Sequence, residues 1–157
     1  MSARKSVRGF TLVEILIVVI ILAILAVIVI PQFANASGAA RRAALSDQLQ
    51  TLRVQIQLFT LQHGDTKPAI TGADWTPLTT LTVYKGENRG PYLPSIPRNT
   101  LNGFSDIAVV AAEPTFGAAV AGANIGFVYF PTNGSIYATN TAGDKVYNEA
   151  NPDDPAN

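Results

Sequence analysis

One carboxylate, Glu14, interrupts the longest apolar stretch of the sequence. This stretch runs from Phe10 to Ile30, and all of its last sixteen residues, 15–30, are apolar. A carboxylate in such a span costs a few kcal/mol unless it pairs with a cation or lies near the membrane surface. The position of Glu14 therefore predicts either charge pairing or an acid tolerated at the membrane interface.

A second group of acidic side chains lies near the C-terminal end. Carboxylate oxygens are ligands that calcium prefers, so these residues are candidates for a calcium site. Their spacing matches no EF-hand loop, and a solvated acidic tail is the favoured interpretation. The residues concerned are Asp144, Glu149, Asp153 and Asp154, of which Asp144, Asp153 and Asp154 are the calcium candidates.

No motif of an enzyme is present in the sequence. The absence of Cys excludes disulfides, thiolate metal sites and a Cys nucleophile, and a single His excludes His-rich zinc sites. There is also no phosphate-binding glycine loop, dinucleotide fingerprint or HExxH motif. We therefore expect the protein not to be an enzyme and to have no certain cofactor.

The charge balance also limits the partners of the protein. Eleven basic and eleven acidic residues give a formal net charge of zero, whereas a nucleic-acid binder needs a basic surface to displace counterions. Charged residues make up 14% of the chain, against about a quarter in an average domain. We expect no nucleic-acid partner, and an apolar segment that accounts for the low charge.

That segment is the first half of a long predicted helix. Its 21 residues, Phe10 to Ile30, rise roughly 32 Å, about the thickness of a bilayer core. Arg4, Lys5 and Arg8 precede it without any acidic residue, which predicts that residues 1–9 stay on the cytoplasmic side.

The second half of the helix, residues 32–63, is predicted to be amphipathic. Pro31 lacks a backbone N–H and is expected to kink the helix, which should resume beyond it. One apolar stripe follows a helical spacing of four and three residues, and Gly64 suits the end of the helix. The residues of the stripe are Leu45, Leu49, Leu52, Ile56 and Phe59.

The residues around the start of the apolar stretch resemble a known processing motif. Arg8-Gly9-Phe10-Thr11-Leu12-Val13-Glu14 is similar to the signal of type IV prepilins and pseudopilins. This resemblance implies that a prepilin peptidase cleaves between Gly9 and Phe10 and that Phe10 becomes N-methylated. It also implies that Glu14 neutralises the new N-terminal amine of a neighbouring subunit during filament assembly, and Pro31 stands where the family usually has a proline.

Two other interpretations of this segment remain. An ordinary signal peptide has a basic start and a small-residue cleavage site such as Ala34-Asn35-Ala36, which would leave a chain beginning at Ser37. The apolar stretch is longer than the usual 7–15 residues and contains a carboxylate, which argues against this class. The other alternative is an uncleaved membrane anchor.

The residues after Gly64 predict a small β-rich domain. A loop is expected from Asp65 to about Phe104, with one helical turn near 76–83. Strands are expected over 106–113, 125–130 and 135–139, with a hairpin turn at 132–134 between the last two. Two stretches of this loop, Gly90 to Pro97 and Asn99 to Gly103, resemble the major pseudopilin of type II secretion. Tyr92, Leu93 and Ile96 are expected to anchor the loop on the helix, and residues 142–157 to form a mobile polar tail.

These patterns and the resemblance together predict an α+β, pilin-like fold, with a long N-terminal helix packed on a small antiparallel sheet. The predicted parts are a leader at 1–9, an assembly segment at 10–31, an amphipathic segment at 32–63, a loop and sheet domain at 64–141 and the tail.

The resemblance implies a pseudopilus subunit in the bacterial inner membrane, with its C-terminal domain in the periplasm. Its implied partners are copies of itself, minor pseudopilins, the peptidase and an inner-membrane assembly platform. A type IV pilus subunit and a periplasmic binding domain are the alternatives.

Overall fold

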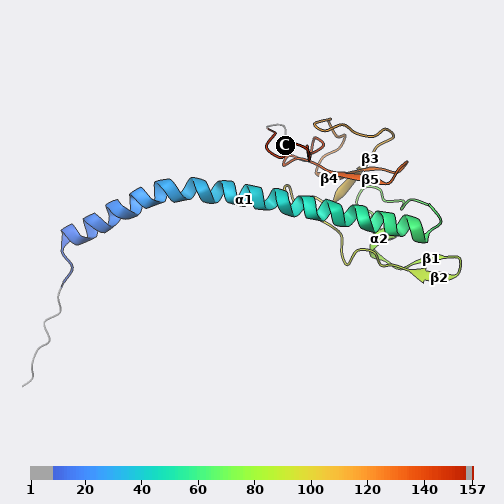
Figure 1. Ribbon diagram of the computed structural model, residues 1–157, viewed down its shortest axis with the longest axis horizontal. Helices are drawn as coiled ribbons and strands as arrows, with labels where there is room; N and C mark the ends of the chain where they lie inside the picture. The colour runs from blue at the N-terminus through green and yellow to red at the C-terminus, as the bar shows by residue number, and fades with distance from the viewer. Residues whose placement is uncertain (1–8, 155–156) are drawn as a thin grey trace, which may run out of the picture. The chain divides into compact units, whose positions relative to one another are not determined.

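The computed structural model describes residues 9–154 and residue 157. Its main element is helix α1, Leu12–Gln62 (Figure 1). The helix is 51 residues long and includes Pro31. The expectation that the helix resumes after Pro31 is confirmed, while a kink there stays a prediction. The chain forms two compact units, Met1–Ala39 and Ala40–Asn157.

Helix α1 ends as the sequence predicts, at a glycine. Gly64 has a positive φ of 60°, and the Asp65 N–H donates to the Thr60 carbonyl at 3.0 Å. This is the hydrogen bond of a Schellman motif, which satisfies a carbonyl of the last helical turn. The positive φ favours glycine, and a side chain at position 64 would also have to displace the Tyr84 hydroxyl.

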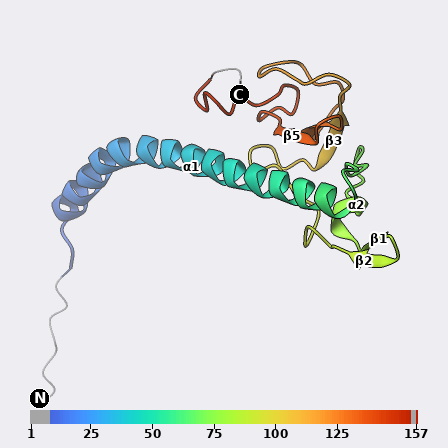
Figure 2. The same ribbon diagram turned by 45° about the vertical axis from the view of Figure 1, so that its right-hand side comes forward.

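After α1, the described part of the second unit contains five strands and a short helix, joined by long loops. They are α2 Thr76–Thr79, β1 Thr82–Tyr84, β2 Glu87–Arg89, β3 Asp106–Val109, β4 Ile125–Phe130 and β5 Ser135–Ala138. Strands β1 and β2 form an antiparallel pair, and β3, β4 and β5 form a sheet in that order. The β3–β4–β5 sheet lies along one side of the C-terminal part of α1, with α2 and the β1–β2 pair around the helix end (Figure 2).

The α+β layout is confirmed, but the main sheet is not wholly antiparallel. Strand β4 pairs with β5 in antiparallel fashion and with β3 in parallel. Two parallel strands must start at the same end of a sheet, so a long connection has to join them. The segment 110–124 is such a connection, because it carries the chain back to the end where β3 began. The expected strand over 106–113 also ends earlier, at Val109, where this connection starts.

The predicted apolar stripe of α1 forms the core of the second unit. Leu45, Leu49, Leu52 and Ile56 are at most 1% exposed, and they belong to one cluster with inward side chains of β4 and β5. Trp75 joins the same cluster, where its ring meets Phe127 edge-on and its Nε1–H donates to the Ser105 carbonyl at 2.8 Å. The stripe is therefore used for packing within the chain.

Two of the three expected anchors hold the long loop. Tyr92 and Leu93 are buried, and their N–H groups both donate to the Leu78 carbonyl at 2.8 Å. The Tyr92 hydroxyl also donates to Gln62 Oε1 on α1 at 2.8 Å. The expectation for Ile96 is wrong, because its side chain is 51% exposed and the loop is already held on both sides of it.

Buried amides connect this loop to the main sheet. Asn99 is fully buried, and its Nδ2 donates at 2.9 Å to both the Gly126 and the Thr139 carbonyls, while its Oδ1 accepts the Leu101 N–H at 2.8 Å. Asn102 acts beside it and donates to the Asn140 carbonyl at 2.8 Å. Side-chain hydrogen bonds therefore hold the loop at the edge of the sheet where β4 begins and β5 ends.

The C-terminal segment differs from the expected mobile tail. Tyr147 is buried, and Val146 N–H donates to the Ala118 carbonyl at 2.9 Å. Glu149 forms a two-point ion pair with Arg53 of α1, with distances of 2.6 and 2.9 Å, and Asp153 pairs with Arg42 at 2.9 Å. The polar composition suggested mobility, but these residues pair with groups that are distant in sequence.

The two ion pairs predict different effects on stability. Glu149→Gln is expected to lower the free energy of unfolding by about 1–2 kcal/mol, because the pair is half-buried and charge-assisted at two points. Asp153→Asn is the matched control, with an expected loss near zero, since Asp153 is 83% exposed. Thermal unfolding of the detergent-solubilised full chain measures both, and equal effects would contradict the assignment.

Candidate functional site

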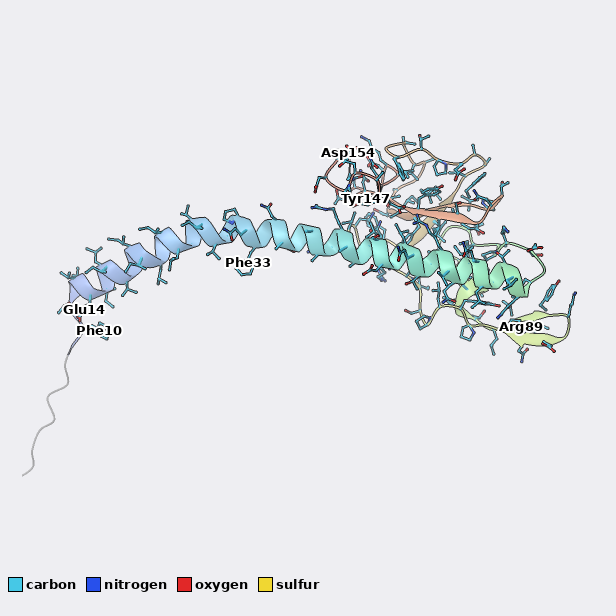
Figure 3. All side chains as sticks on the ribbon, viewed as in Figure 1. Phe10, Glu14, Phe33, Arg89, Tyr147 and Asp154 are labelled. Atoms are coloured by element: carbon cyan, nitrogen blue, oxygen red, sulfur yellow. The ribbon has the colours of Figure 1, made fainter. Side chains whose placement is uncertain are left out.

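The Gly9–Phe10 peptide bond lies outside the helix, before its first residue Leu12. Phe10 is 81% exposed (Figure 3). A Cβ added at Gly9 would have no heavy atom within 4 Å other than those of its two chain neighbours. The described part of the fold thus leaves this bond accessible and does not itself require glycine at position 9.

Thr11 and Glu14 form a reciprocal capping box at the start of α1. The Thr11 N–H and its hydroxyl each donate to Glu14 Oε2 at 2.8 Å, and the Glu14 N–H donates to Thr11 Oγ1 at 3.2 Å. These bonds satisfy N–H groups that the first helical turn leaves without a partner. Sequence reasoning missed Thr11, although a Thr followed by Glu three residues later is the signature of this cap.

The apolar half of α1 presents its side chains outward on every face. The large apolar side chains from Leu12 to Ile30 are between 41% and 83% exposed within their own unit. Helix α1 is long and apolar enough to cross a membrane, judged by length and composition. Such a surface needs a lipid or protein environment, since it exposes apolar area to water on all sides.

The structure does not assemble the calcium candidates into a metal site. Asp153 pairs with Arg42, and Asp154 Oδ2 accepts a hydrogen bond from Asn148 Nδ2 at 2.9 Å. Within residues 9–154 and 157, no three His, Cys, Asp or Glu side chains, Asp144 included, gather closely enough to hold a metal ion.

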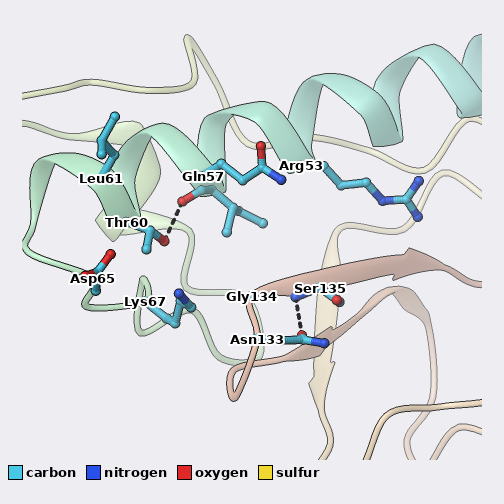
Figure 4. Close-up of a pocket in the computed structure, with 10 residues that line it drawn as sticks. Arg53, Gln57, Thr60, Leu61, Asp65, Lys67, Asn133, Gly134 and Ser135 are labelled. Carbon is cyan, nitrogen blue, oxygen red and sulfur yellow. Dashed lines mark hydrogen bonds between the residues drawn. The ribbon is translucent and has the colours of Figure 1, made fainter.

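A polar cleft of about 350 Å³ lies between the end of α1 and the β4–β5 turn (Figure 4). Several of its polar groups already have partners inside the chain. Thr60 Oγ1 donates to the Ile56 carbonyl, and Ser135 N–H donates to Asn133 Oδ1, both at 2.8 Å. The cleft is thus a product of the turn geometry, and all of its lining residues belong to the Ala40–Asn157 unit.

Residues 4–30 match the family described as the prokaryotic N-terminal methylation motif. The chain carries a prepilin-type N-terminus. This motif contains Gly9, Phe10, Glu14 and most of the apolar segment, and its residues 4–8 lie outside the described structure.

A curated relative supports the same assignment. The chain is 41% identical over 80 residues to prepilin peptidase-dependent protein D of Escherichia coli (strain K12). The aligned region covers 49% of this chain and 53% of the relative. The chain thus spans about half the length of the curated relative it matches. No solved structure matches the chain.

Proposed function

We propose that this protein is a structural subunit of a filament that a prepilin peptidase processes at the Gly9–Phe10 bond. The single observation that carries the proposal is the prokaryotic methylation motif, whose Gly9–Phe10 bond precedes an apolar helix and is exposed. Because the fold does not require glycine at position 9, a demand for glycine there comes from the peptidase, whose active site must approach the backbone closely.

Glu14 has a defined role in this proposal. Cleavage creates an ammonium group on Phe10, four residues before Glu14, and N-methylation leaves its positive charge. When the apolar helices pack together, each such charge leaves water and needs a negative partner. Glu14 of a neighbouring copy supplies that partner, while the Thr11 hydrogen bonds hold the carboxylate at the helix start.

Topology and location follow from the same segment. The basic residues of the leader keep residues 1–9 in the cytoplasm, and the domain after the apolar segment enters the periplasm. The subunit waits in the inner membrane and then joins the filament. Its partners in this scheme are copies of itself, minor subunits, the peptidase and a membrane assembly platform.

Within this class, we favour the pseudopilus of a type II secretion system, which supports protein export. The observation in its favour is the stretch from Gly90 to Gly103, whose Tyr92, Leu93 and Asn99 hold the loop on α1 and the sheet. A type IV pilus subunit for adhesion, motility or DNA uptake is the second candidate, because it shares the N-terminal motif.

Mass analysis of the mature N-terminus tests the proposal. The full chain, produced together with a prepilin peptidase, is expected to begin with N-methylated Phe10. Gly9→Val adds a bulky Cβ substituent at the cleavage site without a clash in the chain, and it is expected to block cleavage almost completely. A mature chain that begins at Ser37 would instead identify an ordinary signal peptide.

A further inference from the structure

Two asparagines of the chain, Asn102 and Asn133, are each followed by a glycine. An asparagine loses its side-chain amide most readily in this dipeptide, because a glycine has no Cβ and its backbone nitrogen can approach the side chain before it. The two pairs have the same local chemistry. A difference in their reactivity must therefore come from the tertiary structure around them.

The reaction needs only water. The backbone nitrogen of the glycine gives up its proton and attacks Cγ of the asparagine, a C–N bond forms, and the side-chain amide leaves as ammonia. Water then opens the resulting ring at one of its two carbonyl groups. The product is an aspartate, or an isoaspartate whose main chain runs through the former side chain, and both carry a new negative charge.

The structure locks the first pair in place. Asn102 is half-buried, and its Nδ2 donates to the Asn140 carbonyl at 2.8 Å while its Oδ1 accepts the Phe104 N–H at 2.9 Å. The N–H of Gly103, whose nitrogen would attack, donates to the Asn99 carbonyl at 2.7 Å. Reaction at Asn102 therefore requires several hydrogen bonds to open together.

The second pair lies at the turn between β4 and β5 (Figure 4). Asn133 is exposed, and within the described residues its side chain makes one hydrogen bond, in which Oδ1 accepts the Ser135 N–H at 2.8 Å. The Gly134 N–H donates to the Phe130 carbonyl at 3.0 Å. These two bonds at an exposed hairpin tip open at a lower cost than the network around Asn102.

We propose that Asn133 is a site of spontaneous deamidation in the folded protein, whereas the fold protects Asn102 from the same reaction. The inference goes beyond the proposed filament function. It depends neither on cleavage after Gly9 nor on assembly, because all of the groups that it uses lie in the Ala40–Asn157 unit.

The aspartate product suits the turn in which it forms. A carboxylate at position 133 still accepts the Ser135 N–H, now in a charge-assisted hydrogen bond. The residues that line the adjacent cleft include two cations, Arg53 and Lys67, and one acid, Asp65, so the new negative charge meets a favourable surrounding. The isoaspartate product instead adds an atom to the main chain and loosens the turn.

Peptide-resolved mass spectrometry tests the selectivity. The detergent-solubilised full chain is incubated in mildly alkaline buffer, because base removes the proton of the attacking nitrogen. In the folded chain, Asn133 is expected to lose ammonia at least about tenfold faster than Asn102. In guanidinium chloride both pairs lose their structure, and their rates should agree within about threefold.

Three variants provide the controls. Asn133→Gln keeps an amide but moves it one methylene away from the attacking nitrogen, so it should abolish the reaction at this position. Asn133→Asp imitates the product and is expected to shift the unfolding temperature by no more than about 2 °C. Asn102→Asp, the matched change at the other pair, should lower it by at least about 5 °C, because a carboxylate cannot donate to the Ile125 and Asn140 carbonyls.

Each outcome decides the inference without deciding the proposed function. Equal rates at the two pairs in the folded chain would overturn it, as would a folded chain in which both stay intact while the denatured chain reacts. Equal destabilisation by Asn133→Asp and Asn102→Asp would overturn the tolerance of the turn for the product. A chain that is never cleaved after Gly9 would overturn the proposed function and leave this inference standing.

Discussion

Glu14→Ala is expected to reduce filament formation at least about a hundredfold while leaving cleavage after Gly9 largely intact. Cleavage should persist because the cleaved bond lies outside the helix and does not depend on the carboxylate. Assembly should fail because an ammonium group left unpaired in an apolar bundle costs about 3–5 kcal/mol. Filament yield after shearing and mass analysis of the N-terminus measure the two effects separately. Unimpaired filaments would remove the role that we assign to Glu14.

The capping box makes a sharper control necessary. Glu14→Ala removes both a charge and a helix cap, because Glu14 Oε2 accepts two hydrogen bonds from Thr11. Glu14→Gln keeps an acceptor for the cap and removes only the charge. If the charge is what assembly needs, the Gln variant should fail like the Ala variant. Full recovery of filaments in Glu14→Gln would show that the cap is the important feature.

Asn99→Ala is expected to lower the free energy of unfolding by about 3 kcal/mol, because several backbone groups lose their partners in a dry environment. The Gly126 and Thr139 carbonyls lose a donor, and the Leu101 N–H loses its acceptor. The corresponding fall in the unfolding temperature is about 10 °C for a unit of this size. Thermal unfolding of the full chain in detergent measures it.

Two further variants identify the cause of this loss. Asn88→Ala changes the same side chain at an exposed position on β2 and is expected to shift the unfolding temperature by no more than a degree or two. Asn99→Asp retains the acceptor for Leu101 but places a carboxylate against two carbonyl oxygens, so it should be at least as harmful as Asn99→Ala. A stable Asn99→Asp variant would contradict the hydrogen-bond explanation.

The helix and the methylation motif of the N-terminal segment were predictable because they depend on local sequence. An unbroken run of apolar residues, a leader with Arg and Lys, and the spacing of Gly9, Phe10 and Glu14 are properties of consecutive positions. The same holds for the helix, whose stripe has a helical period and whose end at Gly64 needs a positive φ. The hydrogen bonds between Thr11 and Glu14 were also predictable, because these residues have the spacing of a capping box. The sequence analysis did not predict them.

The C-terminal domain was predictable only in part, because its decisive contacts join distant residues. Local patterns located β4 and the β4–β5 turn, but the parallel pairing of β3 depends on the path of residues 110–124. The polar tail is held by Arg53 and Arg42, about a hundred residues earlier, and no local composition reveals such pairs.

The sequence by itself determined the membrane-length apolar helix, its processing motif and the stripe that packs on the sheet, because periodicity and composition express these directly. Only the tertiary structure decided which polar residues are structural. It placed Asn99 in the core, tied Glu149 and Asp153 to α1 and left Asp144, Asp153 and Asp154 without a common site. It also decided which face of α1 is buried, since burial of Leu52 and exposure of Val54 depend on where the sheet lies.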